Sequence, residues 1–247
     1  MNPIRSLRVP TAVPARPRRG GWRLTSAFVA IPISLTLAAA APSQPVRDGQ
    51  LIRFGLVSVD PQARTASLPG RVNMSRGVLE YALVTDYGKT HESLFVTDAE
   101  PADLQAALLL LGAKPSGPAS LATNKPPSAR PEHLVGIDAT WDHAGTRTRY
   151  ALHELVDLAT ADSTHSVTGH LAPGRWLFNG SMITTEGFAA HFEGSVIALI
   201  RDPSAVLNNP RPDLDDDDIH VPASGRVPTN GTPVDIRFSF RKDKPAP

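Results

Sequence analysis

Apolar and polar positions alternate with a period of two in several segments of the chain. Successive side chains of a strand point to opposite faces, so this period is typical of β-strands. The alternating segments are residues 51–72, 77–98, 133–156, 175–200 and 234–240. Turn residues interrupt the first three of them, at Asp60-Pro61, Asp86-Tyr87-Gly88 and His143-Ala144-Gly145. The pattern predicts a domain built mostly of antiparallel β-sheet.

One segment changes from a period of two to a period of 3.6. Its apolar stripe, at i, i+3, i+4 and i+7, consists of Leu104, Ala107, Leu108 and Leu111. Pro101 suits the first helical turn, and Gly112 suits the position just past the end. Leu109 and Leu110 widen the stripe, which predicts burial on more than one side. We therefore expect an α+β fold, mostly antiparallel sheet with one well-defined buried helix at about 101–111 and short helical turns.

Two segments are predicted to be loops within a single β-rich domain that spans residues 42–247. Residues 113–132 are rich in Pro, Ser and Ala and poor in large apolar side chains. Residues 211–233 contain the acidic run Asp213–Asp218. Crowded carboxylates repel one another, so we expect this run to be solvated and calcium binding to be disfavoured.

Residues 1–41 have the pattern of an export signal. An arginine-rich start precedes the uncharged apolar run 24–41, which ends in small residues. Ala38 and Ala40 satisfy the requirement for cleavage after Ala40. The alternative is an uncleaved membrane tether, because the run approaches the length needed to span a bilayer. Either way, we expect an exported protein that is periplasmic, extracellular or anchored to the inner membrane.

Charge and cysteine content exclude several classes of protein. Six of the 25 Lys and Arg residues lie in residues 1–41, so the rest of the chain carries more acidic than basic residues. That balance argues against nucleic acid as a partner, which requires a basic face. The chain has no cysteine. This excludes disulfides, thiol catalysis and a cysteine-held iron–sulfur cluster.

Several motifs resemble those of the YdjY-type domain, a family of exported bacterial proteins with no established activity. The motifs are Gly77–Glu80, "GKTHESL" (88–94), "PADLQAALLLLGAKP" (101–115), "WDHAGTRTRYALHELV" (141–156), "WLFNGS" (176–181), "EGSVIALIRDPSAVLNNP" (193–210) and "GTPVDI" (231–236). The resemblance covers roughly residues 50–240. It implies a fold and a compartment, and it supplies no catalytic residues.

His91 and Glu92 are the first candidates for a functional site. On a strand these neighbours would face opposite sides, so we expect them to act separately. Glu80 and Lys89 flank the same predicted hairpin, where a buried ion pair is the structural alternative to ligand binding. With the aromatic Trp176, the candidate ligand-binding residues are Glu80, Lys89, His91, Glu92 and Trp176.

A metal site is the second hypothesis. Imidazole suits zinc and copper, and His91 could meet His153, His170 or His191 across neighbouring strands. The local zinc-protease motif fails, because Phe95 stands where the second histidine would be.

The motifs of nucleophilic catalysis are missing from the sequence, which contains neither G-x-S-x-G nor a Gly-rich phosphate loop. We therefore expect a non-catalytic binding or structural module whose partner is an envelope protein or a small ligand. The alternative is a metal-dependent protein centred on His91.

Overall fold

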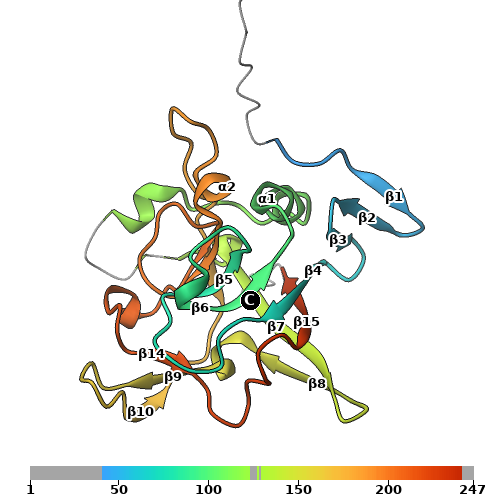
Figure 1. The fold of residues 1–247 in the computed structure, drawn as a ribbon. Coiled ribbons are helices and arrows are strands. Elements are labelled where there is room, and N and C mark those ends of the chain that lie inside the picture. The colour runs from blue at the N-terminus through green and yellow to red at the C-terminus, as the bar shows by residue number, and fades with distance from the viewer. Residues whose placement is uncertain (1–40, 123–126, 128, 241–247) are drawn as a thin grey trace, which may run out of the picture. The chain divides into compact units, whose positions relative to one another are not determined.

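Eight strands close into a ring in the computed structural model, which describes residues 41–122, 127 and 129–240 (Figure 1). These residues belong to the second of the two units into which the chain divides, residues 1–37 and 38–247. Around the ring the strands are β4 (Thr65–Val72), β15 (Pro233–Ser239), β7 (Leu134–His143), β11 (Trp176–Phe178), β13 (Leu207–Asn208), β12 (Ser195–Ala198), β5 (Tyr81–Thr85) and β6 (Ser93–Thr97). Strand β6 then pairs with β4, which closes the barrel.

The expected α+β class is wrong, because the closed barrel and its additional strands make the described domain mostly β. Strands β1 (Val46–Asp48), β2 (Leu51–Phe54) and β3 (Val57–Asp60) extend the sheet from β4, and β8 (Thr146–Ala151) pairs with β7. A second sheet consists of β10 (Val167–His170), β9 (Val156–Ala159) and β14 (His220–Pro222). The α-helices described are α1 (Pro101–Leu110) and α2 (Ala189–Glu193). Short 3₁₀ helices are η1 (Thr90–Glu92), η2 (Pro118–Leu121), η3 (Pro131–His133), η4 (Leu152–Leu155) and η5 (Pro212–Asp215).

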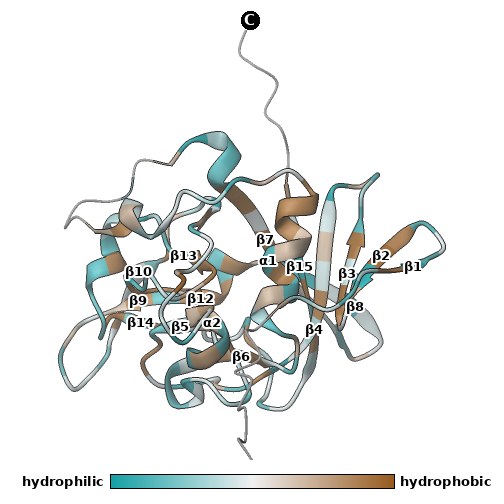
Figure 2. Ribbon diagram, turned by 90° about the horizontal axis from the view of Figure 1, so that it is seen from above, coloured by the Kyte–Doolittle hydropathy of each residue, from teal (hydrophilic) through white to brown (hydrophobic). Residues whose placement is uncertain are grey.

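One side of the barrel faces solvent and the other is covered. Strands β4, β7 and β15 alternate between buried and more exposed residues, whereas every residue of β5, β6, β11, β12 and β13 is buried. The main core includes residues from the covered strands and from α1. A separate, smaller cluster consists of Tyr81, Val84, Val96, Ala198 and Ala205. Figure 2 shows apolar residues on both the strands and α1.

Helix α1 forms where the sequence predicts it. Leu104 and Leu108 are fully buried, and α1 contacts β2, β3, β4 and α2. Leu109 and Leu110, however, are 46% and 49% exposed. These two leucines therefore do not widen the buried stripe. Burial on more than one side is instead due to Pro101, Ala102 and Asp103 in the first turn.

Strands β5 and β6 are parallel, although the turn at residues 86–88 predicts a hairpin. Tyr81 pairs with Ser93, and Thr85 pairs with Thr97. Parallel strands usually need a connection of about a dozen residues or more, but here residues 86–92 suffice. We call this segment the crossover, and η1 lies at its end.

Two glycines pack the crossover against the start of β12. A Cβ atom on Gly194 would lie 2.3 Å from the Thr85 Oγ1 atom and 2.7 Å from the Gly88 Cα atom. Gly194 also has a φ of 69° and ends α2. A side chain at residue 194 would therefore push the crossover away from the barrel.

The two predicted loops are more ordered than expected. In the described part of residues 113–132, the backbone amides of Ser116 and Gly117 bond to the carbonyls of Phe178 and Asn179. The acidic segment contains η5 and strand β14, which the sequence did not predict. Asp213 bonds to His220 at 2.7 Å and Asp215 to Arg201 at 2.6 Å, so the acidic run is not a wholly solvated one.

We predict that Gly194→Ala destabilises the protein more than Gly231→Ala. Both residues have positive φ, but a Cβ atom on Gly231 would meet nothing within 4 Å. Both changes carry a backbone cost of roughly 1–2 kcal/mol, because an L-residue is strained in the left-handed conformation. Overpacking should add about 1–3 kcal/mol at residue 194 alone. Urea unfolding of the two variants measures the difference, and equal losses would contradict the proposed packing of the crossover.

Candidate functional site

The crossover brings Lys89 to Tyr81 of β5, and hydrogen bonds connect Lys89, Tyr81 and Asp202 in series. The Lys89 Nζ atom lies 2.6 Å from the Tyr81 hydroxyl and donates to it, and that hydroxyl lies 3.1 Å from Asp202 Oδ2. The Lys89 ammonium also lies 4.8 Å from the centre of the Tyr81 ring. Tyr81 and Asp202 are buried, whereas Lys89 is half-buried at the edge of the crossover.

This arrangement keeps the phenol in its neutral form. Burial, followed by the charge of Asp202, raises the pKa of Tyr81 well above its usual value. The Tyr81 hydroxyl therefore donates to Asp202 while it accepts from Lys89. Such a group holds its neighbours in place and does not act as a base or a nucleophile at neutral pH.

The buried segment that carries Asp202 is fixed by two asparagines. The Asn208 Nδ2 atom donates to the Asn179 Oδ1 atom and to the Asp202 carbonyl, both at 2.8 Å. The Asn179 Nδ2 atom donates to the Ala205 carbonyl at 2.9 Å. Both asparagines are fully buried, which is costly unless the amides are bonded, so these contacts specify the path of residues 202–208.

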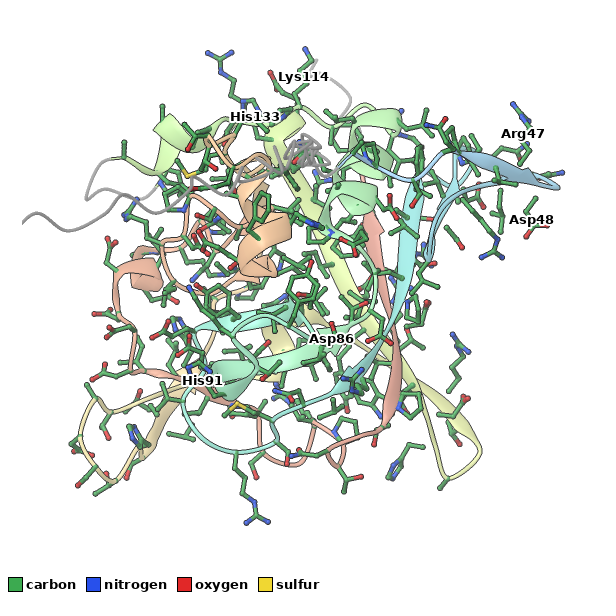
Figure 3. All side chains as sticks on the ribbon, turned by 45° about the horizontal axis from the view of Figure 1, so that its top comes forward. Arg47, Asp48, Asp86, His91, Lys114 and His133 are labelled. Carbon is green, nitrogen blue, oxygen red and sulfur yellow. The ribbon has the colours of Figure 1, made fainter. Side chains whose placement is uncertain are left out.

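Glu80, His91 and Glu92 lie together beside Lys89, contrary to the expectation that His91 and Glu92 face apart. The expectation is wrong because both residues lie in η1, where neighbouring side chains do not alternate. The His91 Nε2 and Glu92 Oε2 atoms are 3.6 Å apart. His91 lies at the surface with 79% of its side chain exposed (Figure 3), whereas 21% of the Glu92 side chain is exposed.

Burial and neighbouring charges shift the pKa of Glu80. Burial raises the pKa of Glu80 above its ordinary value of 4.5, and the nearby carboxylate of Glu92 raises it further. The Lys89 ammonium acts in the opposite direction but does not reverse the shift. The carboxylates of Glu80 and Glu92 and the ammonium of Lys89 thus lie close together beside the crossover.

The other candidate histidines have separate partners. His170 bonds to Asp157 at 2.6 Å, and His191 bonds to Glu100 at 2.9 Å. Burial and the charge of Arg211 lower the pKa of His153. Across residues 41–122, 127 and 129–240, no three His, Asp or Glu side chains are arranged to hold a metal ion.

Trp176 is fully buried and does not contribute to a surface site. Its ring packs under Arg211, whose guanidinium carbon lies 4.9 Å from the ring centre. Arg211 donates in turn to the carbonyl of Gly174 at 3.0 Å and to Asn209 Oδ1 at 3.0 Å. Of the five candidate ligand-binding residues, the structure therefore groups Glu80, Lys89, His91 and Glu92 and separates Trp176 from them.

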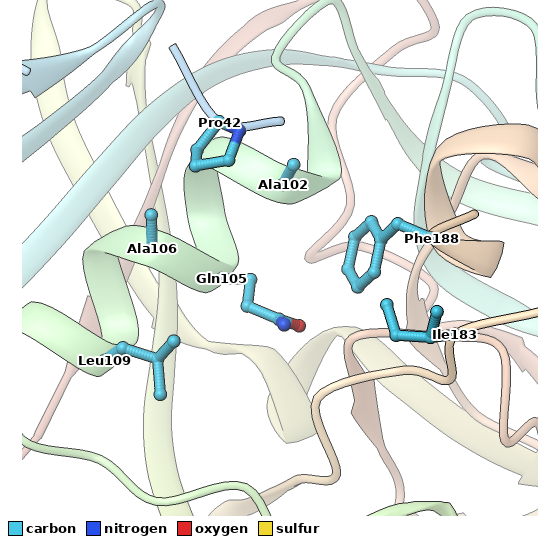
Figure 4. Close-up of a pocket in the computed structure, with 7 residues that line it drawn as sticks. All are labelled: Pro42, Ala102, Gln105, Ala106, Leu109, Ile183 and Phe188. Atoms are coloured by element: carbon cyan, nitrogen blue, oxygen red, sulfur yellow. The ribbon is translucent and has the colours of Figure 1, made fainter. Parts of the chain in front are cut away.

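An apolar groove lies between α1 and the segment before α2 (Figure 4). Its volume is about 250 Å³. The residues that line it are Pro42, Ala102, Gln105, Ala106, Leu109, Ile183 and Phe188. Gln105 points between the helix and Ile183 in Figure 4, and its Oε1 atom is buried without a hydrogen-bond partner in the described chain.

Large exposed apolar side chains surround this groove. Ile183 is 76% exposed, and Leu109, Leu110 and Phe192 are each close to half exposed. The half-exposed ring of Tyr87 lies 6.4 Å from that of His191, which lies 5.2 Å from the ring of Phe192. Exposed apolar side chains next to an apolar groove are typical of an interaction surface.

The chain enters the described domain at this groove. The Ser43 backbone amide and hydroxyl donate to the two carboxylate oxygens of Asp103, at 2.5 and 2.9 Å. Asp103 is buried at the start of α1, and Pro42 forms part of the groove wall. Residues 42 and 43 are therefore fixed against α1.

The sequence alone did not reveal Tyr81, Asp202, Ser43 or Asp103 as important residues. Tyr81 and Asp202 are 121 positions apart, and Ser43 and Asp103 are 60 apart, so no local spacing relates either pair. The one available signal was polar residues inside otherwise apolar runs, such as Asp103 in the α1 motif.

The predicted signal segment lies outside the described residues, except for Ala41. Within the described ranges, neither helix has the length and hydropathy needed to cross a bilayer.

Comparison with known proteins gave one match. The model of the YdjY domain family matches residues 57–239, which include the whole closed barrel. Searches of curated proteins and of solved structures found nothing that matches this chain.

We predict that Glu80→Gln stabilises the protein relative to wild type, and increasingly so as pH rises. Because its pKa is raised on folding, the folded state binds the Glu80 proton more tightly than the unfolded state. This carboxyl's contribution to the free energy of unfolding therefore falls as pH rises above 4.5. Urea unfolding from about pH 4 to about pH 8 measures the difference between the two proteins.

The control for losing a glutamate charge is Glu186→Gln, at an exposed position. A stability difference between Glu80→Gln and wild type that stays constant or shrinks with pH would contradict the assigned environment of Glu80.

Proposed function

The chain belongs to the YdjY domain family, and on that premise we propose that it is an exported cell-envelope protein that acts as a non-catalytic binding module. Its binding surface in this proposal is the apolar groove between α1 and residues 183–188. The observation that carries the proposal is the exposure of Ile183, Leu109 and Phe192 around a groove that already has defined walls.

The chemistry of the groove favours an apolar occupant. Its lining is mostly Pro, Ala, Leu, Ile and Phe, and burial of such surface contributes about 25 cal/mol per Å². The Gln105 Oε1 atom, which has no hydrogen-bond partner among the described residues, adds an acceptor to which a donor of the occupant could bond.

The polar network at the crossover supports a structural role for its residues. The Tyr81 hydroxyl is bonded on both sides, and Asp202 accepts a further bond from the Ser204 amide at 2.8 Å. A neutral phenol and a fully bonded carboxylate are suited to holding residues 202–208 in place. This favours binding or an envelope-building role over catalysis.

Export is supported by the order of charged and apolar residues in residues 1–41. A fold held without cysteine also suits an exported domain, because its stability does not depend on the redox state of the compartment.

The metal-dependent alternative is centred on His91, which pairs with Glu92. This pair, with Glu80 nearby, would have to recruit a further ligand. The same preparation that tests export also tests this alternative.

We predict that replacing apolar residues of the groove reduces binding of an apolar fluorescent probe, anilinonaphthalene sulfonate. Ile183→Ser and Leu109→Ser should both lower its fluorescence, because each removes exposed apolar surface from the binding site. Val167→Ser is the matched control, since Val167 is 54% exposed but lies in β10. Exposed substitutions usually change stability by less than about 0.5 kcal/mol, so all three variants should remain folded. An equal loss in all three, or in none, would count against the groove.

We predict that untagged protein from an osmotic-shock or membrane fraction contains either the intact chain or a chain that begins at Ala41. Intact mass distinguishes the two, and recovery only from the cytoplasm would refute export.

Elemental analysis of the same sample should find no stoichiometric zinc or copper. Stoichiometric metal that is lost in a folded His91→Ala variant would favour the metal-dependent alternative.

A further inference from the structure

We propose that the apolar groove and the exposed side chains around it face a lipid bilayer, and that the bilayer surface is the occupant of this site. This inference rests on the proposed function, because it names the partner of the same groove. It follows from where the chain enters the domain, from the side chains exposed there and from their charge.

The first step is the short distance between the apolar run and the domain. The run ends at residue 41, whereas Ser43 is fixed by two hydrogen bonds to the buried Asp103. An extended chain spans at most about 3.6 Å per residue, so the end of the run lies within roughly 7 Å of Ser43. In the uncleaved chain, the apolar run therefore joins the described domain at the groove, whose wall includes Pro42 (Figure 4).

The second step is the distribution of exposed apolar side chains. Eight large hydrophobic residues are markedly exposed in the described chain. Five of them belong to α1, to residues 183–192 or to the crossover, namely Tyr87, Leu109, Leu110, Ile183 and Phe192. Aliphatic side chains beside aromatic ones are the composition with which a peripheral surface enters the interface, to a depth of about 5–10 Å.

The third step is charge. The segment that carries Ile183 and Phe192 also carries the exposed acids Glu186 and Glu193. A face with this composition gains little from anionic lipid, whose surface potential attracts basic segments. The expected partner is therefore the apolar–polar boundary of the bilayer itself, and zwitterionic phosphatidylcholine should suffice.

The absence of cysteine from the chain makes a direct test practicable. Single variants Ile183→Cys, Leu109→Cys and Val167→Cys of the full chain would each carry a bimane label. Each labelled protein would be reconstituted into phosphatidylcholine vesicles that contain lipid with a nitroxide quencher near the headgroup. Labels at residues 183 and 109 should lose most of their fluorescence, while the label at residue 167 keeps it. Replacing part of the phosphatidylcholine with anionic lipid should leave this pattern unchanged.

Unquenched labels at both residue 183 and residue 109 would overturn the inference. Disulfide-linked dimers of unlabelled Ile183→Cys would place a second copy on the groove. A label shielded from both water-soluble and lipid quenchers would place protein there instead. Either result would refute the lipid partner while leaving the groove as a binding surface. Failure of the fluorescent-probe experiment, by contrast, would refute the proposed function itself.

Discussion

The described domain depends on the close packing of the seven-residue crossover against the start of β12. Strands β5 and β6 run parallel, so the chain must return the full length of β5 within residues 86–92. It does so where Gly88 and Gly194 come into backbone contact. Because β6 also pairs with β4, this short return is what brings the two ends of the strand ring together.

The same return explains why the polar residues of the "GKTHESL" motif gather in one place. The tight path through η1 places Lys89 over Tyr81 and turns His91 toward Glu92. The lysine then completes a bonded chain into the segment that carries Asp202. The geometry of a parallel connection therefore explains why the polar side chains of the motif lie close together.

Local pattern predicted the elements that depend on neighbouring residues. Helix α1, the β3–β4 hairpin at Asp60, the β7–β8 hairpin and strand β15 lie where periodicity and turn residues place them. The family was also predicted correctly from its motifs. Ring closure could not be predicted, because it depends on pairs such as Arg71 with Pro233 that no local spacing relates. The α+β class was wrong for this reason, since a sheet that closes on itself buries its inner face without a layer of helices.

The candidate site could be predicted only in part, because some of its contacts join residues close in sequence and others join distant segments. Glu80, Lys89, His91 and Glu92 are close in sequence, so their grouping could be anticipated even though the strand geometry assumed for them was wrong. The bonds from Tyr81 to Asp202 and from Ser43 to Asp103 join distant segments. The groove likewise combines Pro42, α1 and Ile183, which only the folded chain brings together.

The position of β15 between β4 and β7 has a consequence for when the protein can fold. Residues 65–72 remain an open edge until residues 233–239 have left the ribosome, so the barrel cannot form on a partly synthesised chain. Pairing across so long a stretch of sequence also makes folding slow. Until residues 233–239 are available, strands β4 and β7 therefore each lack one partner, and the nascent chain exposes two unpaired strand edges.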